Sequence, residues 1–134
     1  MVSIKNVEVI GEISARKLRW AGIETTEALL ERGATPRGRR KIAAETGLSS
    51  KRILEWVNHV DLFRIPGVGE EYAELLEKAG VDTVVEFSRR DPASLREKIE
   101  AINEEKELVG RLPSESRLEE WIEEAQKLPR VVKY

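Results

Sequence analysis

The chain has 134 residues and a formal net charge of −2, with no cysteine and one histidine. These counts exclude disulfide bonds, thiol catalysis, cysteine zinc sites and histidine clusters. Apolar runs are short and the N-terminal segment lacks a signal-peptide core, so we expect a cytoplasmic protein without membrane contact. The charge is uneven, because residues 1–60 carry 11 Lys and Arg against 7 Asp and Glu, and residues 61–134 carry 12 against 18.

The sequence contains an internal repeat. Shifted against itself by a constant offset, it aligns 7–29 with 65–87 through Gly11/Gly69, Glu12/Glu70, Ala15/Ala73, Leu18/Leu76, Ala21/Ala79, Gly22/Gly80 and Thr25/Thr83. At a slightly larger offset it aligns Ser49/Ser114, Arg52/Arg117, Glu55/Glu120 and Trp56/Trp121, so the second copy is longer in its middle. Each copy alone is too small to bury its apolar stripes. We therefore predict two repeats, 1–62 and 63–134, that pack as one compact domain.

Helical signals follow one another in the first copy. Thr25 is placed to cap a short helix, and Thr35-Pro36 pairs a capping residue with proline at the first helical position, which predicts a helix near 36–46. Ser49 or Ser50 opens a fourth helix.

The second copy repeats this order. An apolar stripe ends at Gly80, which stops its helix by taking a left-handed conformation, and Thr83 caps the next helix. Asp91-Pro92 begins a helix near 92–108, and Ser114 opens the last one. No alternating segment is long enough for a strand. The prediction is an all-α fold, a tandem pseudo-repeat of hairpin units that are each followed by two further helices.

The most informative stretch is the turn at Gly67, Val68 and Gly69. Two glycines around an apolar residue allow a tight turn in which Val68 enters the core and amides at the next helix start stay unpaired. Such amides can bind phosphate, so all three residues are candidate nucleic-acid contacts.

These turn residues resemble the helix-hairpin-helix superfamily. The resemblance implies binding of the nucleic-acid backbone without sequence readout, sometimes with a monovalent cation held by hairpin carbonyls. Over nearly its whole length the chain also resembles a bacterial and archaeal family catalogued only as a domain of unknown function and built from such hairpins. The residues that carry this second resemblance are 33–39, 44–48, 53–59, 61–65 and 67–69. It implies the fold but no reaction.

Both hairpins depart from the pattern of DNA-binding hairpins. Glu70 and Glu71 follow the glycines in the second copy and Glu12 follows in the first, where carboxylates repel phosphate. Val9 replaces the first glycine of the first copy. A helix–helix corner without any nucleic-acid contact is the alternative interpretation.

Basic residues gather in the first copy. Residues 32–41 contain no acidic side chain, and residues 36–39 fall in the first turn of a predicted helix, where free amides and guanidinium groups can act on one phosphate. An ordinary solvated face is the alternative. The candidate phosphate contacts are Arg16, Lys17, Arg19, Arg32, Arg37, Arg39, Arg40 and Lys41.

The three tryptophans differ in their surroundings. Trp20 lies off the Leu18 and Ala21 stripe, so we expect an exposed indole that stacks on a base or anchors a protein partner or second copy, unless it fills a gap between helices. Trp56 and Trp121 recur between apolar neighbours, which indicates core positions. The lone His59 is expected on the surface or at a cap.

No nucleotide-binding loop, catalytic triad or deaminase signature is present, so we expect a binding module, not an enzyme, with no metal. The first hypothesis is backbone binding of DNA or RNA by the basic half, with the turn at Gly67 as a weaker contact. The second is a protein-interaction or homo-oligomerisation module. Charge favours the second hypothesis and resemblance favours the first.

Overall fold

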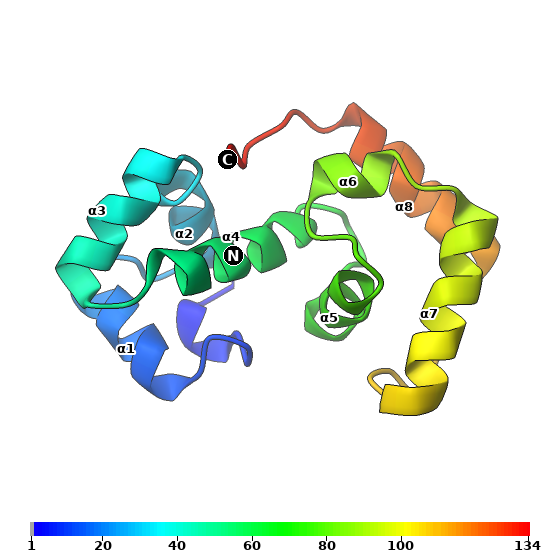
Figure 1. Cartoon of the computed structure of the whole chain (residues 1–134), viewed down its shortest axis with the longest axis horizontal. Helices are drawn as coiled ribbons and strands as arrows, with labels where there is room; N and C mark the ends of the chain where they lie inside the picture. The colour runs from blue at the N-terminus through cyan, green and yellow to red at the C-terminus, as the bar shows by residue number, and fades with distance from the viewer. Residues whose placement is uncertain (1) are drawn as a thin grey trace. The chain divides into compact units, whose positions relative to one another are not determined.

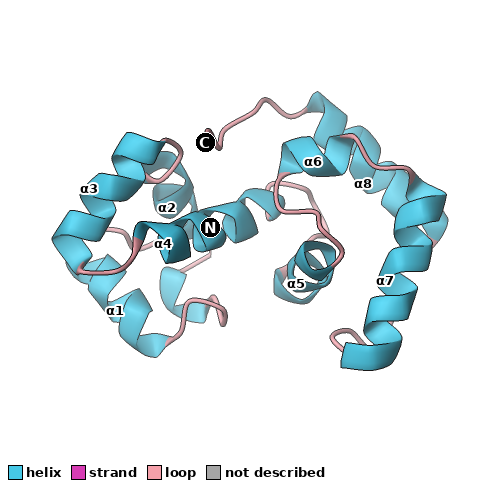
Figure 2. Cartoon of the chain, viewed as in Figure 1, coloured by secondary structure: helices cyan, strands magenta, loops and turns pink. Residues whose placement is uncertain are grey.

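The computed structural model describes residues 2–134 (Figure 1). Within them Figure 2 shows helices and loops without a strand, and one isolated antiparallel bridge joins Ser3 and Thr25. The predicted all-α class is confirmed. The elements are η1 (Ile4–Asn6, a 3-10 helix), α1 (Glu12–Trp20), α2 (Thr26–Arg32), α3 (Pro36–Thr46), α4 (Ser50–Leu62), α5 (Glu70–Lys78), α6 (Val84–Ser88), α7 (Pro92–Lys106) and α8 (Glu115–Lys127).

The chain divides into two compact units. The first comprises residues 1–61 and 131–134, and the second comprises residues 62–130. The first unit carries 12 Lys and Arg against 8 Asp and Glu, and the second carries 11 against 17. The return of the last four residues to the first unit is a long-range feature that the repeat pattern does not predict.

Side-chain caps begin the helices where the sequence places them. Thr25 accepts a hydrogen bond from the Ala28 amide at 3.1 Å, and Thr35 accepts one from the Gly38 amide at 3.0 Å. Thr83, Asp91 and Ser114 accept equivalent bonds at the starts of α6, α7 and α8. These predicted caps are confirmed, because each depends only on residues within one helical turn.

Helix α7 is two residues shorter than predicted. It ends at Lys106, and Glu107 takes a left-handed conformation with φ 50°. The Asn103 side chain donates to the Val109 carbonyl at 3.1 Å and accepts from the Val109 amide at 3.0 Å. This pair of bonds turns the chain back toward α7 and ends the helix.

The ends of α1 and α5 carry the same hydrogen bonds. Gly22 and Gly80 have φ values of 89° and 90°, which favour glycine. The Ile23 amide donates to the Leu18 carbonyl at 2.9 Å, and at the equivalent position of the second copy the Val81 amide donates to the Leu76 carbonyl at 2.9 Å.

An arginine closes each of these corners. Arg32 donates to the Ala21 carbonyl at 2.8 Å, and Arg90 donates to the Ala79 carbonyl at 3.2 Å. Each guanidinium satisfies a carbonyl that the helix end leaves without an intrahelical partner.

The first unit buries apolar residues of η1 and α1–α4. Trp56 of α4 is buried as predicted, with the Arg52 guanidinium 4.9 Å from its ring centroid. His59 is also buried, so its expected surface position is wrong. It lies three residues after Trp56, which continues the buried face of α4.

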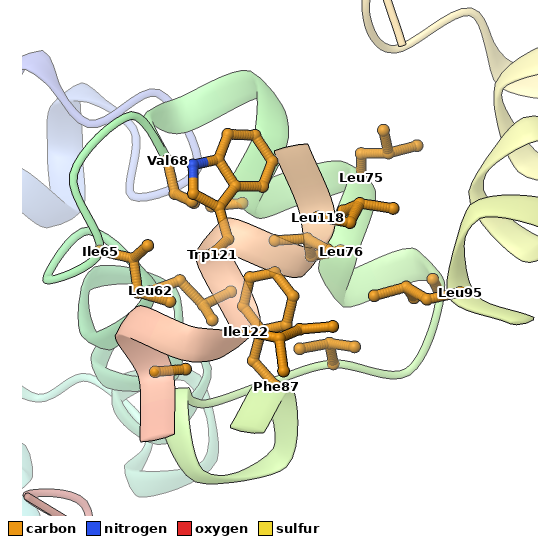
Figure 3. Packing of buried hydrophobic residues seen from close by; sticks show 14 of the residues in the cluster. Leu62, Ile65, Val68, Leu75, Leu76, Phe87, Leu95, Leu118, Trp121 and Ile122 are labelled. Carbon is orange, nitrogen blue, oxygen red and sulfur yellow. The ribbon is translucent and has the colours of Figure 1, made fainter. Parts of the chain in front are cut away.

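The second unit has a core formed by α5–α8 and the turn that precedes α5. Figure 3 shows Trp121 of α8 beside Val68, with Leu76, Phe87 and Ile122 nearby. The core positions predicted for Trp121 and Val68 are confirmed. Helix α8 packs against both α6 and α7.

Candidate functional site

One face of α1 presents both cations and apolar side chains to solvent. Ile13 is 70% exposed and Trp20 is 91% exposed. Arg16 and Lys17 are exposed between them. Because these four residues are spaced by three, four and seven positions, they share one side of the helix. We call this set of four the α1 face. The predicted exposure of Trp20 is confirmed.

The opposite side of α1 explains why this face points outward. Ala15 and Leu18 are buried, and α1 packs against α3 and η1 (Figure 1). The helix begins at Glu12, and its N-cap is Gly11, whose φ is 82°. The helix is therefore held by its apolar side, which leaves the α1 face exposed.

A shallow hollow of about 220 Å³ lies beside Trp20. Arg16, Lys17 and Trp20 line it from α1, and Glu45 and Thr46 line it from the end of α3. The hollow therefore brings two predicted cations and the predicted aromatic contact together at one place.

Two carboxylates near the α1 face are partly neutralised. Glu45 accepts a charged hydrogen bond from Arg32 at 3.1 Å, and Glu12 pairs with Arg16 at 3.3 Å. The second pair is largely exposed, and such pairs contribute little and are screened by salt. A phosphate could therefore compete with Glu12 for Arg16.

Arg32 makes structural hydrogen bonds, and its predicted contact with phosphate stays a prediction. Its side chain is half-buried, and its two terminal nitrogens donate to the Ala21 carbonyl and to Glu45. Both bonds tie α2 to the ends of neighbouring helices. We therefore leave Arg32 out of the candidate surface.

Arg39 lies inside the first unit, which corrects its expected place in the basic patch. The residue is 5% exposed, and its Nη1 and Nη2 donate to the carbonyls of Gly33 at 2.8 Å and Lys133 at 2.7 Å. Burial lowers the pKa of the Arg39 guanidinium from its ordinary value. An arginine still stays protonated, so the charge is held in place by the two carbonyls.

The first turn of α3 also differs from the predicted anion site. The Gly38 amide donates to the Thr35 hydroxyl, and the Arg39 amide donates to the Thr35 carbonyl at 3.0 Å. With these two amides satisfied and Arg39 turned inward, this turn offers fewer donors than predicted, and its contact with phosphate stays a prediction.

The remaining predicted cations of the first unit are exposed. They are Arg19 of α1 and Arg37, Arg40 and Lys41 of α3. Arg40 lines a different hollow of about 490 Å³, together with Lys51 and Tyr134. Lys51 was not among the predicted residues, because it stands outside the basic run. Ile13 lies seven residues before Trp20 and, like it, off the buried stripe, and Glu71 occupies the equivalent position of the second copy.

The turn at Gly67, Val68 and Gly69 belongs to the second unit. Gly67 has a φ of 93°, and Gly69 precedes the first residue of α5 without a side-chain cap. Glu70 and Glu71 occupy the first turn of α5. The geometry allows a tight corner, and contact of this turn with nucleic acid stays a prediction.

Within residues 2–134, no group of three or more histidine or acidic side chains is arranged to hold a metal ion. In the same part of the chain, no helix combines the length and apolar character needed to span a membrane.

A comparison with protein-family models matches residues 8–128 to a domain of unknown function, DUF4332. The match covers most of the chain, so the protein belongs to this family, and the predicted membership of a family of unknown function is confirmed. Searches of curated proteins and of solved structures gave no match.

Proposed function

We propose that this member of the DUF4332 family is a non-enzymatic binding module whose first unit binds the backbone of nucleic acid without reading its sequence. One observation carries the proposal. The α1 face places an exposed indole, Trp20, beside two exposed cations, Arg16 and Lys17, and beside a hollow.

This combination suits single-stranded nucleic acid. Cations neutralise phosphates and release counterions, while an exposed aromatic ring stacks on a base of any identity. A base stacked on Trp20 would place the adjoining phosphates near Arg16 and Lys17. We therefore expect single strands to bind more tightly than duplexes, in which the bases are already stacked.

The charge of the first unit supports the same proposal. Its excess of four positive charges attracts a polyanion at long range, and the second unit carries an excess of six negative charges. Exposed cations also occur at Arg19 of α1 and at Arg37 and Lys41 of α3. They extend the cationic surface of the first unit beyond the α1 face.

We also propose that each unit opens with a helix-hairpin-helix. The backbone hydrogen bonds at the ends of α1 and α5 join equivalent residues, which supports this proposal. The hydrogen bonds from Arg32 and Arg90 to the carbonyls of Ala21 and Ala79 support it too. On this proposal the turn at Gly67 is the weaker of two contacts, because Glu70 and Glu71 repel phosphate.

The exposure of Ile13 favours an alternative, a protein-interaction or homo-oligomerisation module. Ile13 and Trp20 lie two helical turns apart on one face, which is the spacing of apolar anchors in helix-mediated interfaces. An acidic surface of a second copy would suit the cations between them.

Fluorescence anisotropy of labelled oligonucleotides tests the proposal. The double variant Arg16→Glu, Lys17→Glu should weaken single-strand binding roughly tenfold or more at low salt. The control, Lys78→Glu with Arg89→Glu, makes the same change in net charge at exposed positions of the second unit and should change affinity less than about twofold.

Equal losses in both double variants would show that only net charge matters and would contradict the assignment to the α1 face. Absence of binding by the wild type at low salt would contradict nucleic-acid binding itself. In that case light scattering tests the alternative, because Trp20→Ala should then lower the mass of an oligomer.

A further inference from the structure

A pocket of about 370 Å³ lies in the second unit between α5 and the start of α8. Residues 111–114 form one side, and Tyr72, Arg117 and Trp121 form the others. This volume falls within the range of about 300–1,000 Å³ that small-molecule sites occupy in proteins. The pocket belongs to the second unit and the α1 face to the first, and the inference drawn from the pocket does not rest on the proposed function.

The apolar wall of the pocket is held in a fixed position. The rings of Tyr72 and Trp121 are 5.5 Å apart and tilted by 56°. The Tyr72 hydroxyl donates to the Arg111 carbonyl at 3.0 Å, which ties α5 to the loop before α8. Leu112 and Pro113 complete the wall. A planar apolar group therefore meets a preformed surface.

Two donors stand at this wall. The Arg117 guanidinium lies 5.3 Å from the Trp121 ring centroid. Trp121 is 3% exposed, and its indole N–H has no hydrogen-bond acceptor within residues 2–134. A buried donor of this kind is uncommon, because an unmade hydrogen bond is unfavourable. An acceptor supplied by a ligand would satisfy it.

Both donor groups lie close to Gly67, in the turn that precedes α5. A Cβ atom on Gly67 would lie 2.6 Å from Nη2 of Arg117 and 3.1 Å from Nε1 of Trp121. Both nitrogens therefore lie beside the same glycine and close to each other. Two neighbouring N–H groups, one of them charged, are suited to the oxygens of a carboxylate or phosphate. Arg111 adds a second cation to the lining.

We infer that this pocket binds a small aryl anion, a carboxylate or phosphate that carries one planar apolar group. The anionic oxygens accept hydrogen bonds from Arg117 and the Trp121 indole, and the planar group packs against Tyr72, Leu112 and Pro113. The negative charge of the second unit disfavours a polyanion at this place, whereas one anionic group can be neutralised locally by two arginines.

The first unit offers a matched control. The Arg52 guanidinium lies 4.9 Å from the centroid of the Trp56 ring, and the Arg117 guanidinium lies at a similar distance from the Trp121 ring. The position of the first copy that is equivalent to Tyr72 is Ser14, which supplies no ring. The loop at 111–113 falls in the middle of the second copy, where that copy is longer than the first. The arginine and tryptophan pair is thus shared, but the aromatic wall is not.

Nuclear magnetic resonance of the three indole N–H groups tests the inference with phenyl phosphate as the probe. The Trp121 indole signal should move in a saturable manner at millimolar probe, while the signal of the buried Trp56 stays in place. Arg117→Ala should weaken binding roughly tenfold, since it removes one charged donor. Arg52→Ala should leave the affinity unchanged.

Three results would overturn the inference. They are a Trp121 signal that does not respond, equal effects of Arg117→Ala and Arg52→Ala, and inorganic phosphate that binds as tightly as phenyl phosphate. The last result would remove the role assigned to the aromatic wall. Because Arg117 is exposed, its substitution should leave the second unit folded.

Discussion

Helices α1 and α5 have the same length, the same left-handed glycine two residues after their last helical residue and the same hydrogen bonds at their ends. Their outer surfaces are opposite in character. Where α1 has Ile13, Arg16 and Trp20, α5 has Glu71, Glu74 and Lys78. The difference teaches that residues facing the core preserve the corner, while the solvent-facing residues are free to acquire a separate function in each unit.

The largest contrast in stability is expected between an exposed and a buried tryptophan. Trp56→Ala should destabilise the protein by about 3–5 kcal/mol, because it leaves a cavity in the first unit. Trp20→Ala should change the free energy of unfolding by less than about 0.5 kcal/mol. Urea unfolding followed by circular dichroism measures both. A large loss in Trp20→Ala would show that its indole packs inside the molecule.

The next contrast in stability is between Arg39, which is buried, and Arg40, which is exposed. Arg39→Ala removes two charged hydrogen bonds to the Gly33 and Lys133 carbonyls and should cost about 3 kcal/mol. Arg40→Ala changes an exposed neighbour and should cost less than about 0.5 kcal/mol. The same unfolding assay compares them. If the two variants are equally stable, the attachment of residues 131–134 through Arg39 contributes nothing.

A smaller effect is expected at the turn of the second unit. Gly67→Ala places a Cβ close to Arg117 and Trp121 at a positive φ and should cost about 1–2 kcal/mol. The control is Gly110→Ala, where no atom lies within 4 Å of the added carbon and where the cost should stay below about 0.5 kcal/mol. If Gly67→Ala costs no more stability than Gly110→Ala, the turn adjusts to the added carbon without strain.

The caps should give the smallest effects, and they should be equal in the two units. Thr25→Ala and Thr83→Ala each remove one cap from equivalent helices and should each cost about 1 kcal/mol. Unfolding measurements on the two single variants check this. Strongly unequal losses of unfolding free energy would indicate that the two corners differ in stability in spite of their equivalent hydrogen bonds.

Local features of the fold were predictable because their causes are local. Helix α3 begins at Pro36 after the Thr35 cap, as predicted. Gly80 takes the predicted left-handed conformation just after α5. Both features depend only on neighbours within a few positions. Arg39 was misplaced because its partner, Lys133, lies near the opposite end of the chain. His59 was misplaced because a polar residue at a core spacing looks like a surface residue in the sequence.

The candidate surface was predictable in part. Trp20 departs from its counterpart Lys78, and this departure correctly indicated an exposed indole. Arg32 could not be separated from its basic neighbours, because its bond to Ala21 depends on how two helices meet. The pocket beside Trp121 combines α5 with the loop at 111–114 and α8, which are far apart in the sequence, so no single pattern indicates it.

The salt dependence of single-strand binding tests the central claim most directly. If Arg16 and Lys17 each neutralise a phosphate, the slope of log K against log salt should become less steep by about 1.4 in the double variant Arg16→Ala, Lys17→Ala than in the wild type. We expect this loss of slope together with weaker binding. An unchanged slope would contradict binding through the α1 face, because the phosphates would then be bound elsewhere on the molecule.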